Sequence, residues 1–221
     1  MLLSAEGLGY TARGDTGPHV VLDRVSVALD SGEIVDVTGP SGAGKTTLLR
    51  ALARLLPDVT GSLALSGRPA AEFAPPEWRR RVTLLPQTTA LMPGTVRDNL
   101  LLPWSLKVRS GDRPPPDGSL EQALHDVGLA EIALTRDASR LSVGQAARVA
   151  LLRVVLAAPA VLLLDEPEAN LDDESAAQVA VLTERFAASG GAVVRVRHQR
   201  GGVAASRTLH LAGGHLTEVA R

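Results

Sequence analysis

The amino-acid sequence predicts an α/β domain with a mainly parallel sheet, and three observations support this fold class. Strand-like and helix-like segments alternate along most of the chain, which is the pattern of a parallel sheet with helices on its faces. The 221 residues are 45% hydrophobic, enough for one sizeable core. The stretch 95–139 breaks the alternation with the proline-rich loop "GDRPPPDG". We therefore expect a single domain over residues 1–221, with a core of 1–94 and 140–221 and a helical subdomain inserted at about 95–139.

The first part of the chain is expected to form an antiparallel β portion, followed by a strand, a glycine loop and a helix. Val25, Val27 and Leu29 alternate with polar or small residues, as in a half-buried strand. The apolar run "EIVDVTG" leads into Gly39, and "TTLLRALARLL" then has helical spacing until Pro57.

The middle of the chain contains short strands and an early helix. "GSLALSG" and "RVTLLPQ" are expected to be strands, with "WRRR", from Trp78 to Arg81, as the solvated start of the second one. "SLEQALHDVG" is expected to be a helix that begins with a capping box of Ser119 and Gln122.

The last third of the chain returns to alternating elements. After "LSVGQ" we expect the apolar helix "AARVALLRVVLAA", the buried strand "AVLLLDE", a helix from about Asp173 to Ala188 and the strand "AVVRVRH". The end, "TLHLAGGHLTEV", is typical of a hairpin that turns at Gly213 and Gly214.

Composition and charge argue against several classes of function. The formal net charge is −1, so no overall basic field attracts nucleic acid or an anionic membrane surface. The sequence has no cysteine, which excludes disulfides, thiolate metal sites and a cysteine nucleophile. The most apolar stretch, from Val154 to Leu164, contains Pro159 and is much shorter than the roughly 20 residues of a membrane-spanning helix. We expect no nucleic-acid partner, no signal peptide and a cytoplasmic location.

The segment "GPSGAGKT" matches G-x-x-x-x-G-K-[ST], the pattern of a phosphate-binding P-loop. Backbone N–H groups can surround a phosphate only where no side chain blocks them, and the positive end of the following helix dipole adds attraction. Lys45, one of only two lysines, would neutralise phosphate oxygens, and Thr46 would offer its hydroxyl to Mg²⁺. The alternative is a glycine turn that only caps a helix. The expected nucleotide-binding residues are Gly39, Pro40, Ser41, Gly42, Ala43, Gly44, Lys45, Thr46 and Thr47.

A P-loop needs a carboxylate partner for its metal ion, and the strand "AVLLLDE" ends in two acidic residues. Asp165 is suited to a Mg²⁺ contact, directly or through water. Glu166 is suited to accept a proton from an attacking water molecule as a general base. The alternative is that the pair only caps the next helix. We interpret the pair as catalytic.

With these motifs, the sequence resembles the ABC transporter ATPase family over nearly its whole length. "LSVGQ" is similar to the family signature LSGGQ and is followed by Arg148 and a long helix. The resemblance implies a P-loop NTPase core with a mainly parallel sheet, an N-terminal antiparallel β portion and an inserted α-helical subdomain. It also implies head-to-tail dimers, in which the signature of one subunit closes over ATP held by the other. Ser142, Gly144 and Gln145 would then bind the partner's nucleotide at a helix N-terminus, with a plain N-cap as the alternative.

The resemblance implies further site residues. Gln87 in "LLPQ" is similar to the glutamine that senses Mg²⁺ and the attacking water, and His198 in "RVRHQ" is similar to the histidine that holds the γ-phosphate. "ANLD", which ends at Asp172, is similar to the loop that crosses the dimer interface, although Asp172 is equally suited to cap a helix. Tyr10 stands where an aromatic ring stacks on adenine in the family, with a role in the core or in a hairpin as the equal alternative.

The sequence departs from the family pattern at two positions. Val143 replaces a glycine of the signature, and a β-branched residue resists positive φ and adds bulk. We expect function to survive and the tightness of the closed dimer to change. Gln199 follows His198, where the family usually has Asp.

The resemblance implies an ATPase that binds ATP and Mg²⁺, pairs with a second ATPase subunit and drives a separate transmembrane permease subunit. We expect a homodimer, with a heterodimer as the alternative. Such a subunit would sit peripherally on the inner face of the cell membrane. "TVRDNLLLPW", which ends at Trp104, resembles single-domain ATPases of iron export, and a tryptophan that packs in the docking cleft of any membrane partner is the alternative. A soluble ABC ATPase that acts on DNA or ribosomes is a competing function, but no second P-loop or heptad pattern supports it. A small-molecule kinase would leave "LSVGQ" and His198 unexplained.

Overall fold

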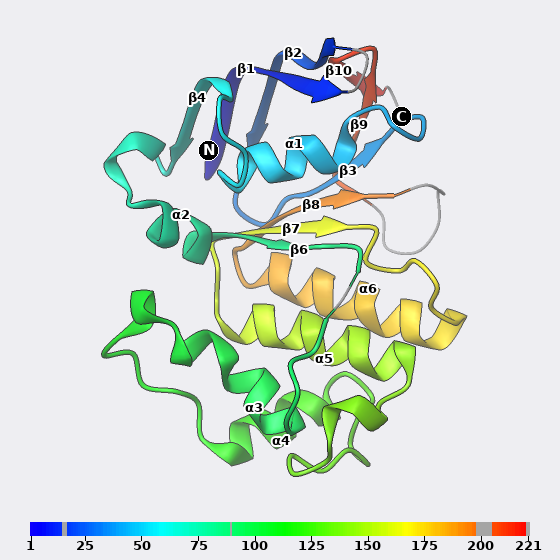
Figure 1. Ribbon diagram of the computed structural model, residues 1–221. Helices are drawn as coiled ribbons and strands as arrows, with labels where there is room; N and C mark the ends of the chain where they lie inside the picture. Colours follow the sequence, from blue (N-terminus) through cyan, green and yellow to red (C-terminus); the bar gives the residue numbers. More distant parts are fainter. Residues whose placement is uncertain (15–16, 89, 198–204, 220–221) are drawn as a thin grey trace.

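The computed structural model describes residues 1–14, 17–88, 90–197 and 205–219. Within these residues the strands form two sheets, a smaller one in the order β2-β1-β4-β5 and a larger one in the order β10-β9-β3-β8-β7-β6. Figure 1 shows the smaller sheet at the top, the helix α1 between the two sheets, and most other helices below the larger sheet.

The smaller sheet is antiparallel and consists of β1 (Leu3–Gly14), β2 (Gly17–Leu29), β4 (Thr60–Leu65) and β5 (Arg68–Pro69). Val25, Val27 and Leu29 of β2 are all buried, as their alternation with polar and small residues predicts. The antiparallel N-terminal portion expected from the sequence is therefore confirmed.

The larger sheet consists of β3 (Ile34–Thr38), β6 (Val82–Leu85), β7 (Val161–Asp165), β8 (Ala192–Val196), β9 (Arg207–Ala212) and β10 (His215–Val219). All neighbouring pairs are parallel except β9 and β10. Those two strands form the expected hairpin, with Gly213 and Gly214 at φ 56° and 83° in its turn. β7 and β8 are buried along their whole length, which is typical of central parallel strands.

Three helices cover the larger sheet: α1 (Lys45–Leu52), α5 (Val143–Leu156) and α6 (Asp173–Ala188). Leu48 and Leu49 of α1 share one apolar core with residues of both sheets. Leu162 and Leu164 of β7 share a second core with α5, α6 and the helical subdomain. α1 and α5 therefore lie on opposite faces of the larger sheet (Figure 1). None of the helices in the described residues has the length and apolar character that spanning a bilayer requires.

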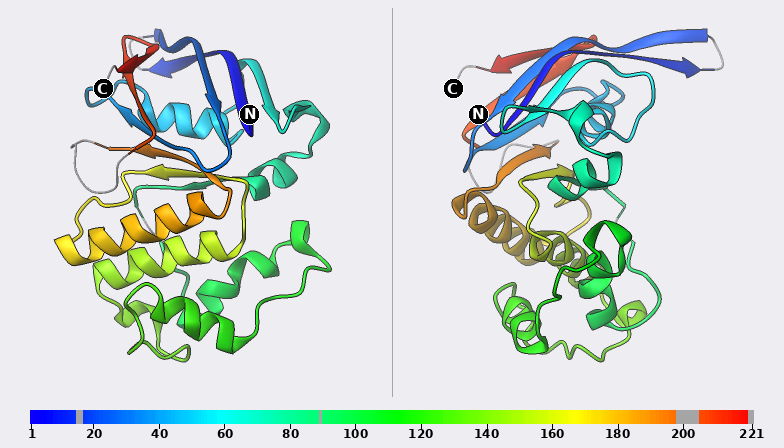
Figure 2. Two further views of the ribbon diagram at one scale, coloured as in Figure 1. Left: turned by 180° about the vertical axis from the view of Figure 1, so that it is seen from behind. Right: turned by 90° about the vertical axis from the view of Figure 1, so that its left-hand side faces the viewer.

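The inserted segment is helical and lies beyond α5 (Figure 2). It contains α3 (Val96–Leu101), α4 (Asp117–His125) and the 3₁₀ turns η2 (Leu102–Ser105), η3 (Lys107–Arg109) and η4 (Ala138–Arg140). Its two connections to the core lie side by side, because Ala138 N donates to Gly94 O at 2.9 Å and Val96 N donates to Arg136 O at 2.9 Å. The predicted fold class is confirmed, while the boundaries near 94 and 140 stay a prediction.

The expected strand start at "WRRR" is wrong. These residues end α2 (Pro75–Arg81), which follows the 3₁₀ turn η1 (Ala70–Glu72). Pro75 opens the helix, where a proline is tolerated because the missing N–H has no intrahelical partner. Trp78 is fully buried, donates through Nε1 to Leu52 O at 2.9 Å, and packs edge-on against Phe73. The three arginines that follow Trp78 suggested an exposed segment, whereas the packing shows that Trp78 anchors the helix in the apolar core.

Two helix boundaries also differ from the sequence expectation. α4 begins at Asp117 after Pro116, so Ser119 lies inside the helix and makes no capping box with Gln122. Gln122 Nε2 instead donates to Asp126 Oδ1 at 2.8 Å. α1 ends at Leu52 rather than near Pro57, because Arg54 adopts φ 53° and its guanidinium donates to backbone carbonyls of the segment before α2.

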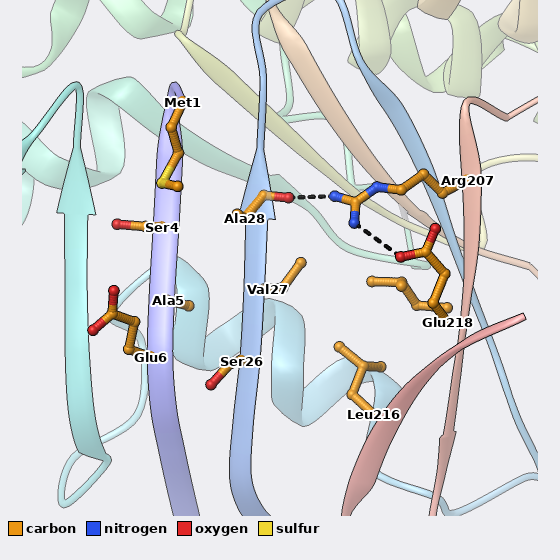
Figure 3. A pocket seen from close by; sticks show the side chains of 11 residues that line it. Met1, Ser4, Ala5, Glu6, Ser26, Val27, Ala28, Arg207, Leu216 and Glu218 are labelled. Atoms are coloured by element: carbon orange, nitrogen blue, oxygen red, sulfur yellow. Dashed lines mark hydrogen bonds and ion pairs between the residues drawn. The ribbon is translucent and has the colours of Figure 1, made fainter.

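A shallow pocket marks the seam between the two sheets, and Arg207 of β9 crosses it (Figure 3). Its guanidinium donates to the carbonyl of Ala28 in β2 and lies 3.3 Å from Glu218 Oε2 in β10. Arg207 Nε also donates to Glu33 Oε1 at 2.6 Å. One side chain thus joins both sheets far along the strands from the P-loop.

Candidate active site

The P-loop lies between β3 and α1, and its path requires glycine at two positions. Gly39 has φ 146°, and a Cβ atom there would lie 2.1 Å from Leu211 O in β9. Gly44 has φ 97°, and a Cβ atom there would lie 2.7 Å from Val21 Cγ1 in β2. At both positions a residue with a side chain would be strained by the positive φ and would have no space for its Cβ atom. The tip of the loop, Pro40 to Gly42, is exposed.

Lys45 holds its ammonium group over this loop. The side chain is buried, and Nζ donates to Gly39 O and Pro40 O, both at 2.9 Å. Ala43 N donates to Pro40 O at 3.2 Å and tightens the turn. The positive charge and the N-terminal end of α1 therefore act on the same small region, which is the electrostatic environment that a phosphate requires.

Thr46 and Asp165 meet at the ends of α1 and β7. Thr46 Oγ1 donates to Asp165 Oδ2 at 2.8 Å. The other carboxylate oxygen, Oδ1, is buried and has no hydrogen-bond partner among the described residues. Burial raises the pKa of Asp165 above its ordinary value, and the Thr46 hydrogen bond acts in the opposite direction. A hydroxyl beside an unsatisfied carboxylate oxygen suits a hard divalent cation, so these two residues fit Mg²⁺.

Glu166 and Gln87 also meet, although they are far apart in sequence. Gln87 lies in the exposed segment after β6, and its Nε2 donates to Glu166 Oε2 at 2.9 Å. Glu166 has φ 50°, an uncommon conformation for a non-glycine residue, and its N–H donates to Val196 O in β8 at 3.2 Å. Strain of this kind is typical of functional sites. The structure therefore holds a second carboxylate, in contact with an amide, directly after Asp165.

The signature loop starts α5 with a reciprocal capping box. Gln145 N donates to Ser142 Oγ at 3.2 Å, and Ser142 N donates to Gln145 Oε1 at 3.0 Å. The first turn leaves the amides of Val143 and Gly144 without an intrahelical acceptor. A Cβ atom on Gly144 would lie 2.3 Å from Ser175 Oγ in α6. Glycine is thus needed here for helix packing, a reason that sequence reasoning did not supply.

Val143 does not have the strained backbone expected from the sequence. It lies in the first turn of α5 and is not among the described residues with positive φ. Its side chain is 68% exposed. The expectation of a conformational penalty is therefore wrong, and the bulk of the exposed side chain is what remains of the departure from glycine.

The other predicted site residues are distributed as follows. Tyr10 lies in β1, partly buried against the first core and opposite Leu22 in β2. Asp172 caps α6 by accepting from Ser175 N at 2.7 Å, which confirms the helix-cap alternative. His198 lies outside the described residues.

Sequence reasoning missed a group of largely buried charges beside this site. Arg195 and Arg197 at the end of β8 form ion pairs with Asp36 of β3, and Arg197 also pairs with Glu168. The sequence did indicate these charges, because the apolar segments "EIVDV" and "AVVRVR" are interrupted by Asp36, Arg195 and Arg197. Periodicity alone does not reveal which charges face one another.

Comparison with known proteins places these features in a family. Residues 22–169 match the family model described as ABC transporter. The chain is 40% identical over 208 residues to the hemin import ATP-binding protein HmuV of Nocardia farcinica, covering 92% of this chain and 71% of that protein. It is 32% identical over 200 residues to the probable iron export ATP-binding protein FetA of Escherichia coli, covering 90% and 85%.

Solved structures share the fold. The dimeric structure of MJ0796, a bacterial ABC transporter cassette, matches with a TM-score of 0.80 at 23% identity and covers 97% of this chain and 96% of that one. A post-hydrolysis state of MJ0796 bound to ADP and Pi matches with a TM-score of 0.81 at 23% identity, covering 99% and 98%.

Proposed function

The chain belongs to the ABC transporter family as an ATPase subunit, and on this premise we propose that it hydrolyses ATP in a head-to-tail dimer and drives a separate membrane-spanning subunit. One observation carries the proposal. Two contacts, Thr46 with Asp165 and Gln87 with Glu166, bring a candidate metal site and a candidate general base to adjacent residues at the end of β7.

The P-loop residues bind and orient the nucleotide in this proposal. The exposed loop amides and the ammonium of Lys45 contact phosphate oxygens, so Lys45 exchanges its carbonyl acceptors for charged ones. Thr46 and Asp165 would hold Mg²⁺, which when bound would supply positive charge beside the phosphate oxygens. Glu166 accepts the proton of the attacking water, and Gln87 fixes the direction of its carboxylate.

The position of the signature loop supports a dimer. α1 and α5 lie on opposite faces of the larger sheet, and no hydrogen bond or ion pair within the described part of the chain joins residues 141–145 to the P-loop. A second phosphate loop so placed is suited to a nucleotide held by another subunit. We propose a homodimer.

An apolar groove is the proposed docking site for a cytoplasmic segment of the membrane-spanning subunit. The groove lies between α2 and the turns η2 and η3, and Leu102, Pro103, Leu106 and Val108 contribute its apolar lining. Arg109 also lines it and stacks over the ring of Trp104 at 5.2 Å. Trp104 thus supports the groove wall, and docking there would hold the subunit peripherally on the inner membrane face.

Iron, either free or in a porphyrin, is the proposed cargo. The support is the stretch that ends at Trp104, together with two relatives whose names refer to hemin import and iron export.

Co-purification tests the docking proposal. Leu106, 53% exposed in the groove, is changed to Asp, and the tagged protein is purified from membranes that contain its permease. Leu106→Asp and Trp104→Asp should both lose the permease while the ATPase core stays folded, because a charge in an apolar contact is left unpaired. Val20→Asp is the matched control, since Val20 is 62% exposed on β2. Permease recovery equal to wild type in both groove variants would place the contact elsewhere.

A further inference from the structure

A chain of ion pairs crosses from β3 to the segment that follows Glu166. Arg195 Nε donates to Asp36 Oδ1 at 2.8 Å, and Arg197 Nη1 lies 3.8 Å from Asp36 Oδ2. Arg197 Nη2 then donates to Glu168 Oε2 at 2.5 Å. All four side chains are at most 19% exposed. Among the described residues, these two cations and two anions balance in charge.

A contribution to folding stability alone does not explain why the sheet contains these ion pairs. Asp36 and Arg195 are direct cross-strand neighbours in the centre of the sheet, where the rest of β8 is alanine and valine. Taking charges out of water costs much of what their attraction returns, and apolar residues of similar volume often stabilise a core as well or better. The ion pairs therefore point to a requirement for defined geometry.

Glu168 lies within a tight turn that begins at the candidate general base. Ala169 N donates to Glu166 O at 3.0 Å, and Leu171 N donates to Glu168 O at 3.3 Å. Glu166 and Asn170 both have left-handed conformations, with φ 50° and 62°. Such a backbone persists only where surrounding contacts hold it. Arg197 supplies one of these contacts from β8.

The negative charge of the Glu168 carboxylate is compensated by Arg197. Its second oxygen, Oε1, is buried and has no hydrogen-bond partner among the described residues. Loss of the Arg197 contact would leave a largely buried carboxylate uncompensated, so the turn would shift to expose more of Glu168 to water. Because Glu166 begins this turn, its carboxylate would move as well.

The same turn leads to the signature loop. Asp172, one residue after the turn, caps α6 through Ser175 N, and Ser175 fills the space beside Gly144. A shift of residues 166–171 would therefore be transmitted both to the candidate base and to the start of α5.

We propose that Arg197 is a positioning residue for ATP hydrolysis, whose ion pair with Glu168 holds the turn 166–171 against the end of β8 and so fixes the carboxylate of Glu166. This inference rests on the proposed role of Glu166 as the general base. In this role Arg197 contacts neither the nucleotide nor the attacking water. Its loss should therefore lower kcat and leave the nucleotide affinity, which the P-loop determines, unchanged.

The test compares Arg197→Gln, Glu168→Gln and Arg197→Lys in the purified full-length chain. Arg197→Gln and Glu168→Gln should each lower kcat by about ten- to hundredfold, since small misplacements of a catalytic group have effects of this size. The KM for ATP and the affinity for a fluorescent ATP analogue should not change. Arg197→Lys should recover part of kcat, because an ammonium still compensates Glu168. Arg207→Gln is the matched control, since it breaks an ion pair with Glu33 remote from the P-loop and should lower Tm without changing kcat.

Two results would overturn the proposal. One is wild-type kcat in a folded Arg197→Gln or Glu168→Gln protein. The other is a parallel loss of kcat, nucleotide affinity and Tm that Arg207→Gln reproduces. If Arg197→Gln does not fold, Glu168→Gln decides, because glutamine keeps the shape of the side chain and removes only the charge that pairs with Arg197. Glu166→Gln, assayed in parallel, separates the two hypotheses: wild-type turnover in that variant refutes the general base itself, whatever Arg197 does.

Discussion

The P-loop and the signature loop both carry a glycine at the start of a helix, for different physical reasons. In the P-loop, Gly44 caps α1 in a left-handed conformation without any side-chain cap. In the signature loop, Ser142 and Gln145 cap α5, and Gly144 has ordinary helical geometry. The P-loop needs glycine for its left-handed backbone as well as for space, whereas the signature loop needs it only because Ser175 occupies the space of a Cβ atom. A glycine in a motif is therefore not evidence for one particular conformation.

The loops also differ in charge. The P-loop contains Lys45 and lies next to the Thr46–Asp165 contact. Near the signature loop, Arg148 is turned inward, and its guanidinium donates to the carbonyls of Val127 and Gly128. Residues 141–145 of the signature loop therefore offer amides and a helix dipole, and none of these five residues is itself cationic. We expect the signature loop to complete a phosphate site without replacing the P-loop, and the following predictions test this division.

Loss of the lysine should have the largest effect. Lys45→Ala should lower ATP hydrolysis by at least about a hundredfold and remove most nucleotide binding, because the loop loses its only mobile positive charge. Steady-state ATPase assays and binding of a fluorescent ATP analogue measure both quantities. Arg68→Ala removes an equal charge from an exposed ion pair on β5 and should behave as wild type. Normal hydrolysis by Lys45→Ala would refute the P-loop assignment.

Glu166→Gln should lower turnover by roughly a hundredfold to ten-thousandfold, the usual contribution of a general base, while both loops stay intact. ATP should then accumulate a closed dimer, which size-exclusion chromatography detects. Adding Ser142→Arg removes half of the capping box and places a bulky side chain where the partner's phosphate docks. This double variant should bind ATP and stay monomeric. If Glu166→Gln itself stays monomeric with ATP, self-dimerisation is wrong and a heterodimer becomes the hypothesis.

Gly144→Ala should have the smallest effect and should act through packing. The added Cβ would meet Ser175 Oγ, so α5 and α6 must separate, at a cost of about 1–3 kcal/mol in the free energy of unfolding. Thermal and urea unfolding measure it, and Ser175→Gly in the same protein should restore most of the loss. Val143→Ala is the neighbouring control and should be nearly neutral, because Val143 is exposed. Equal destabilisation by both alanines would contradict the packing explanation.

The sequence alone predicted the two loops and the acidic pair, because these motifs depend on short, fixed spacings. "GPSGAGKT" predicted the P-loop between a strand and a helix, and the structure confirms that arrangement. The alternation of strands and helices predicted the parallel sheet, and the resemblance to the ABC transporter family is confirmed by the match over residues 22–169.

Tertiary structure decided the features that depend on contacts between distant residues. The three arginines beside Trp78 suggested a solvated segment. The packing of Trp78 against Phe73 and its hydrogen bond to Leu52 O show instead that "WRRR" belongs to a helix with a buried anchor. The reason for Gly144 required the position of Ser175, about thirty residues later. The pairing of Arg197 with Glu168 required two strands and a turn to come together. Local spacing determines which groups can bind a phosphate, but the orientation of a side chain depends on neighbours that sequence order does not reveal.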